Sequence, residues 1–220
     1  MKETKNDIAM LQELYGVRYY HTSSSAIHEA SKDQTYYFKT FIGRAENIQV
    51  ESGDCIYYLS DDLQFGILKR GQCNINSLHC ATIIRGYMPS EASASLTGIT
   101  VLPYVNGCST RQLLPPARQG DPTLQLLKIP PYSSEQANHI HTTVRVAYIL
   151  EGKGRSIVGM EGKTVSYDLT PGTVCILDPM CPHHFETTYG ESLKVVPLHV
   201  FSSTVLESSH PMYNGTHIIK

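Results

Sequence analysis

The chain has 220 residues, of which 41% are hydrophobic, and its formal net charge at pH 7 is −2. These values fit a globular protein with one large core or two small ones, and they exclude a disordered chain. Because no long run of one charge sign occurs, we expect no nucleic-acid partner. The polar start lacks the apolar region of a signal peptide, and no apolar stretch reaches the length of a membrane span. We therefore expect a cytoplasmic protein with no membrane partner.

The first predicted element is a short amphipathic helix over residues 6–15. Its apolar side chains recur at helical spacing and would form one stripe, made by Ile8, Leu11, Leu14 and Tyr15. Asn6 or Asp7 can cap its start, and Gly16 is expected to end it.

The rest of the chain is rich in short runs of β-forming residues separated by Gly, Asn, Pro and Ser. Strands are predicted over residues 36–42, 54–59, 81–84, 99–104, 124–129, 144–150, 156–160, 174–177 and 194–201. Many short strands with turn signals indicate an all-β sandwich or barrel. Because such strands leave edges that a second copy can cover, we expect a homodimer.

We divide the chain into an N-terminal β-rich region (1–107), a β-barrel region (108–203) and a C-terminal tail (204–220). The run from Gly53 to Leu59 resembles the run that begins at Gly172, so the first region could be a degenerate copy of the second. The alternative is a single barrel to which the N-terminal region adds strands. Residues 103–122 are expected to form an extended or turning connection between the two regions.

The six cysteines form no Cys-x-x-Cys pair, so we expect reduced thiols rather than a disulfide framework. Cys181 lies two residues before His183 and could approach a metal site. A packing role for its side chain is the favoured interpretation.

Three histidines predict a metal site. His139 and His141 are two residues apart, a spacing that places both imidazoles on one face of a β-strand. His183 follows a Pro-Gly turn and the next predicted strand, and can supply a third nitrogen. Neutral imidazole is the commonest ligand of Zn, Fe, Ni and Cu ions, so these histidines are the predicted metal ligands.

The histidine segments resemble the two motifs of the cupin superfamily. The first motif is Gly, five residues, His-x-His, three or four residues, Glu, six residues and Gly. His139, His141 and Gly152 match it, whereas Ser133 replaces the first Gly and Arg145 replaces the Glu.

The second motif is Gly, five residues, Pro-x-Gly, two residues, His, three residues and Asn. Gly172 and His183 match it, whereas three other positions differ, at Asp178, Met180 and Thr187. The resemblance covers about residues 108–203. It implies a double-stranded β-helix (jelly-roll) barrel, here with a short N-terminal helix and additional N-terminal strands, in a three-histidine variant of the family.

Arg145 is the main departure from the cupin pattern, since it stands where the family has its fourth ligand. Alternation along an extended strand would turn Arg145 toward the same side as the histidines. A guanidinium stays protonated and cannot ligate a cation, but it binds a carboxylate with two parallel hydrogen bonds. Arg145 is therefore the candidate substrate-anchoring residue, as in the three-histidine thiol dioxygenases that this arrangement resembles. The alternatives are a β-bulge that turns Arg145 outward and an internal ion pair with Glu135, Asp178 or Glu186.

These observations favour a metal-dependent cupin that acts on a small anionic, carboxylate-bearing substrate. We expect a non-haem iron dioxygenase, an oxidoreductase with Fe(II) as the favoured metal. One alternative is an isomerase or lyase that uses Zn, Mn or Ni. Another is a non-catalytic cupin that binds or senses a small ligand.

Two further histidines and one glutamate complete the candidates. His184 should point to the opposite face from His183. His199 is interpreted as a packed histidine. Glu135, in the loop before His139, could substitute for the missing fourth ligand.

Overall fold

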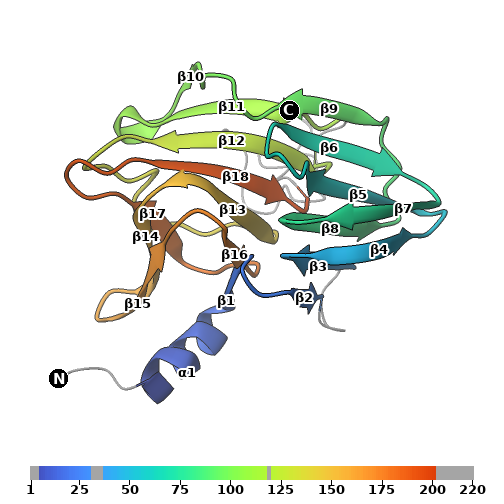
Figure 1. The fold of residues 1–220 in the computed structure, drawn as a ribbon. Coiled ribbons are helices and arrows are strands. Elements are labelled where there is room, and N and C mark those ends of the chain that lie inside the picture. Colours follow the sequence, from blue (N-terminus) through green and yellow to red (C-terminus); the bar gives the residue numbers. More distant parts are fainter. Residues whose placement is uncertain (1–4, 31–36, 118–119, 202–220) are drawn as a thin grey trace, which may run out of the picture.

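The computed structural model describes residues 5–30, 37–117 and 120–201 (Figure 1), so the predicted tail at 204–220 lies outside the described residues. Helix α1 spans Lys5–Tyr15, close to its predicted bounds, and is followed by Gly16 at φ +69°. Leu11 of its predicted apolar stripe is buried, and Tyr15 packs against the core. The prediction for Leu14 was wrong, because this side chain is 69% exposed. No helix in the described ranges is long and apolar enough to cross a membrane.

Two antiparallel sheets form the part of the fold shown at the right of Figure 1. The larger sheet has the order β2 (Ala26–Glu29), β3 (Phe38–Ile42), β8 (Cys80–Arg85), β5 (Asp54–Leu59), β6 (Phe65–Arg70) and β9 (Ala92–Ser95). The smaller sheet pairs β4 (Ala45–Val50) with β7 (Cys73–Ser77). A small apolar cluster lies between them, with Ile48 and Ile75 from the smaller sheet and Ile56 and Ile83 from the larger one.

Two further antiparallel sheets form the barrel that carries the predicted site. The larger has the order β1 (Val17–His21), β16 (Thr173–Leu177), β13 (Arg145–Gly152), β18 (Leu193–His199), β12 (Thr123–Ile129), β11 (Ser109–Leu114) and β10 (Leu102–Pro103). The smaller has the order β15 (Lys163–Leu169), β14 (Gly154–Met160) and β17 (His183–Glu186). A short 3-10 turn, η1 (Val105–Gly107), connects β10 to β11.

Alternate side chains of strand β13 lie in two different buried clusters. Val146 and Tyr148 lie in a large buried cluster that also contains Phe38 and Leu68 of the six-stranded sheet, so the two larger sheets pack face to face. Ala147 and Ile149, which point the opposite way, lie in the core of the barrel. Arg145 is in phase with these two residues and therefore faces the barrel interior.

The all-β prediction is confirmed, since the described elements are strands apart from one short α-helix and one 3-10 turn. Two local predictions were wrong. Residues 103–122 are not mainly a connection, because β11 pairs with β12 along most of its length. The predicted strand at 99–104 is reduced to the two residues of β10. The domain boundaries and the homodimer stay predictions.

Gly152 ends β13 at φ +83°, and a Cβ atom placed there would lie 1.8 Å from the Ser192 carbonyl oxygen. We expect Gly152→Ala to lower the free energy of unfolding by at least about 2 kcal/mol more than Gly190→Ala. Gly190 is the matched control, because its φ is +79° and nothing lies within 4 Å of its added Cβ. Chemical denaturation measures both losses, and equal losses would contradict the role of the close contact.

Candidate metal centre

Backbone pairing brings the three predicted ligands together. His139 and His183 form an isolated antiparallel bridge, in which the His139 N–H donates to the His183 carbonyl at 3.0 Å and the reverse bond is 2.9 Å. The His141 carbonyl accepts from the Met180 N–H at 2.7 Å. The segment with His139 and His141 is thus an extended loop tied to β17. The prediction that it lies within a regular strand was wrong, since β13 begins only at Arg145.

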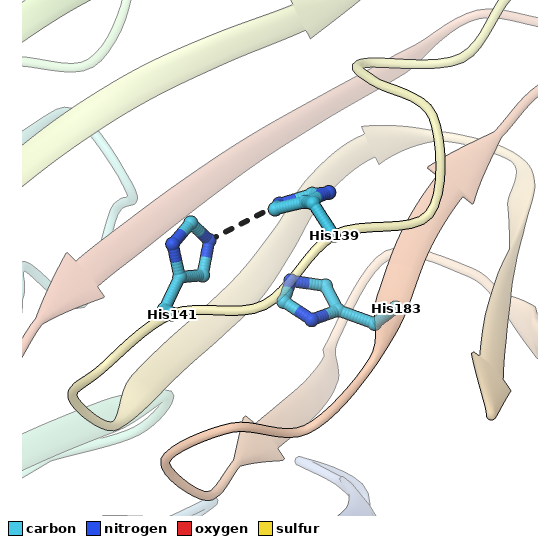
Figure 2. Close-up of side chains that lie close together, drawn as sticks. All are labelled: His139, His141 and His183. Carbon is cyan, nitrogen blue, oxygen red and sulfur yellow. Dashed lines mark hydrogen bonds between the residues drawn. The ribbon is translucent and has the colours of Figure 1, made fainter. Parts of the chain in front are cut away.

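The imidazoles converge on a common point (Figure 2). The Nε2 atoms of His139 and His141 are 3.2 Å apart, and one nitrogen from each of the three rings can be chosen so that all lie within 4.8 Å of one another. Two nitrogens that bind one ion at roughly 2.0–2.1 Å must lie within about 4.2 Å of each other. The pair at 3.2 Å meets this requirement.

Backbone carbonyls orient two of the rings. His139 Nδ1 lies 3.0 Å from the Ala137 carbonyl oxygen, and His183 Nδ1 lies 2.8 Å from that of Cys181. A carbonyl can only accept, so each Nδ1 carries the proton and each Nε2 keeps a lone pair for a cation. The thiol of Cys181 lies in the buried barrel core, which favours its packing interpretation.

Burial keeps the ring nitrogens available. It lowers the pKa of His183 to about 3 and, together with the nearby Arg145 guanidinium, lowers the pKa of His141 to about 2. The pKa of His139 is also lowered, chiefly by burial. All three imidazoles are therefore neutral at pH 7, the form that binds transition metals. This donor set fits a divalent transition metal.

Arg145 lines the same cavity as the three histidines, a space of about 190 Å³. The side chain is buried, and burial lowers its pKa to about 10, so it remains cationic at pH 7. Its hydrogen bonds within the described chain all come from Nη1, to Thr143 and to the carbonyls of Val144 and Phe201. Nε is buried without a hydrogen-bond partner. The guanidinium thus keeps at least one N–H donor that no residue of the described chain uses.

The internal ion pair considered for Arg145 does not form with the described carboxylates. Glu186 instead pairs with Arg155 at 2.6 Å, and Glu135 accepts a hydrogen bond from the Phe185 N–H. Glu135 lines the cavity, but its carboxylate is not among the donor atoms that cluster within 4.8 Å.

Part of the cavity wall was not predicted from the sequence. His199, interpreted as a packed residue, lines the cavity directly opposite Arg145 in the pairing of β13 with β18. Burial lowers its pKa well below the ordinary value. Thr110 and Gln125 also line the cavity, and no sequence motif identified them.

His184 does not line the cavity. Its Nδ1 lies 3.3 Å from Asn138 Oδ1, as expected for the face opposite His183.

Burial raises the pKa of Glu135 from 4.5 to about 8. Between these values the folded, metal-free protein keeps a proton that the unfolded chain releases, so its free energy of unfolding falls as the pH rises. We expect Glu135→Gln to remove this loss and to be more stable than the wild type near pH 8, by on the order of 3 kcal/mol. Denaturation of metal-free protein at pH 5 and pH 8 measures the effect.

The control for this experiment is Glu161→Gln at an exposed position, for which we expect the wild-type pH dependence. If Glu135→Gln and wild type lose stability equally between pH 5 and pH 8, the Glu135 carboxyl is ionised in the folded protein and the expectation is wrong.

Residues 125–201 match the family model for the cupin domain, and no curated protein sequence matches the chain. Two solved structures share the fold. A Pseudomonas aeruginosa protein described as glyoxylate-induced has a TM-score of 0.57 at 8% identity, over 89% of this chain and 92% of that one. A mutant of Bacillus subtilis oxalate decarboxylase has a TM-score of 0.51 at 9% identity, over 85% of this chain and 78% of that one. The cupin domain match at residues 125–201 falls within the segment, 108–203, that resembles the cupin motifs.

Proposed function

We propose that this cupin binds a divalent metal through His139, His141 and His183 and acts on a small carboxylate-bearing substrate. One observation carries the proposal. Arg145 lines the same cavity as the three imidazoles, and its guanidinium Nε is buried without a hydrogen-bond partner. A buried cation with unused donors in a small cavity favours an anionic ligand, and a carboxylate matches the paired N–H groups.

The charge balance of the site supports the same ligand. Three neutral imidazoles leave the charge of a bound divalent metal uncompensated, and Arg145 adds a further positive charge. In the metal-free protein, burial raises the pKa of the cavity-lining Glu135 to about 8, so this carboxyl adds little negative charge near neutral pH. An incoming carboxylate would neutralise part of it.

The reaction that we favour is a non-haem iron dioxygenation. Three protein ligands leave open positions at which Fe(II), when bound, could take substrate and dioxygen together. In this scheme Arg145 orients the substrate carboxylate.

Glu135 favours a second reaction class, an isomerase or lyase with Zn, Mn or Ni. Its carboxyl lies in the cavity wall and has a pKa raised to about 8 by burial. A carboxyl that exchanges a proton near neutral pH suits the proton transfers of such reactions.

Metal analysis of protein purified without added metal, followed by oxygen-uptake measurements over a panel of small carboxylates, tests the proposal. Iron with substrate-dependent uptake supports the dioxygenase. Zinc, manganese or nickel without uptake supports the isomerase or lyase. Protein without metal that also fails to take up any of these ions overturns the metal-dependent function and leaves a ligand-binding cupin.

We also propose that the N-terminal region, residues 1–107, is a degenerate cupin half. Its six-stranded sheet and two-stranded sheet enclose an apolar cluster of their own. Within the described part of this region no set of three metal-ligating side chains comes together. The region would then contribute a packing face to the working barrel rather than a second site.

A further inference from the structure

The seven-stranded sheet forms the cavity wall across from β17, which carries His183. Its inward-facing polar side chains are Arg145 on β13, His199 on β18, Gln125 on β12 and Thr110 on β11. In the ranges that the structure describes, the side chains of Gln125 and Thr110 make no hydrogen bond. Polar groups that line a small cavity without partners are suited to bind a polar group of a ligand.

We propose that Gln125 and Thr110 form a second subsite, which binds a neutral hydroxyl or carbonyl group of the substrate whose carboxylate is bound by Arg145. This inference rests on the proposed function and specifies its substrate class. A glutamine amide and a threonine hydroxyl each offer both a donor and an acceptor, and neither carries a charge. They match a neutral hydrogen-bonding group better than a second carboxylate.

The strand pairing separates the two subsites by a short distance. His199 pairs with Arg145 on one side and with Thr123 on the other, so Gln125 lies two strands from Arg145 and two residues further along β12. With strands roughly 4.8 Å apart and a rise of roughly 3.3 Å per residue, their Cα atoms are separated by about 12 Å. Both side chains are long and line one cavity, which leaves room between them for a ligand of a few carbon atoms.

Besides its polar side chains, the same sheet presents an apolar surface to the cavity. Ala147, Pro197, Val195 and Leu127 line the same cavity. Such a surface would contact hydrocarbon rather than further polar groups. The predicted substrate is therefore a small carboxylic acid in which a short carbon chain separates the carboxylate from a hydroxyl or carbonyl group.

Calorimetric binding to the metal-loaded protein tests this inference. The probes are ω-hydroxy acids of three to five carbons, each paired with the alkanoate in which a methyl group replaces the hydroxyl. For the wild type we expect at least one hydroxy acid to bind about tenfold more tightly than its alkanoate. Gln125→Leu and Thr110→Val keep similar side-chain volumes and remove hydrogen-bonding groups. We expect each to weaken this preference, and the double variant to abolish it, while alkanoate affinity and metal content stay unchanged.

The outcomes separate the two proposals. If the wild type binds alkanoates and hydroxy acids equally, or if the double variant keeps the preference, the second subsite is overturned and the carboxylate site stands. If the wild type binds neither class of probe, the proposed carboxylate function falls together with the subsite. If the double variant loses metal or folds poorly, the preference for hydroxy acids is measured in whichever single variant keeps native metal content and thermal stability. Gln125→Glu is measured beside it, and its added negative charge should lower the affinity for every hydroxy acid relative to wild type.

Discussion

Replacement of His139 and His183 together by alanine is expected to abolish stoichiometric metal binding. The double variant keeps a single imidazole of the cluster. The two replaced residues face each other in an antiparallel backbone bridge. Binding free energies of roughly 10–16 kcal/mol in structural zinc sites are shared among four ligands, so the loss of two should weaken affinity at least about a thousandfold. Elemental analysis after purification, and again after incubation with Fe(II) or Zn(II), measures the content.

The matched control is His184→Ala, since His184 neighbours His183 on β17 but does not line the cavity. This variant should retain the wild-type metal content. Circular dichroism and thermal unfolding establish that the double variant is folded. A folded double variant with one metal ion per chain would show that these histidines are not the ligands.

Replacement of Arg145 by methionine is expected to remove most of the affinity for carboxylates without loss of metal. Methionine keeps much of the side-chain volume, and no proposed metal ligand is removed. Deletion of one partner of a buried, charge-assisted bidentate pair costs on the order of 2–4 kcal/mol, which corresponds to a loss of about 30-fold to 1000-fold in affinity. Titration of metal-loaded protein with a short alkanoate gives this loss directly.

Three further variants refine the test of Arg145. Arg145→Lys keeps a charge but not the paired donors, so its affinity should be intermediate. Arg145→Glu restores the residue that the cupin motif has at this position, and should bind metal more tightly and anions more weakly. Arg44→Met, at an exposed position of the N-terminal region, is the control without effect. Unchanged carboxylate affinity in Arg145→Met would show that the substrate is held elsewhere.

The strands that could be predicted are those with continuous apolar runs between turn residues. Strand β5 has its predicted bounds, because its apolar run begins after Gly53 and ends before the polar turn at Ser60. Strand β15 was missed, since its solvent-facing positions are polar and its sequence, Lys163–Leu169, contains only a few buried residues. Local composition identifies a strand only when most of its side chains are buried.

The inward direction of Arg145 was predicted from alternation, but along a strand that does not include His139. Alternation was counted from His139 along an assumed strand, whereas the inward direction comes from β13, in which Arg145 is in phase with Ala147. The cavity position of His199 could not be predicted in this way. Alternation places a side chain on one face of a strand, but only the assembled sheets show where that face borders a cavity and where it is filled.

Strand β1 has a consequence for how the barrel must be produced. Val17 pairs with Leu177, so the edge next to β16 is completed by residues roughly 160 positions earlier in the chain. A fragment cut to the matched cupin segment, 125–201, would expose the backbone groups of β16 and invite association through that edge. During synthesis β1 must wait until β16, roughly 160 residues later in the chain, has been made. Folding should therefore be slow and limited by this long-range closure.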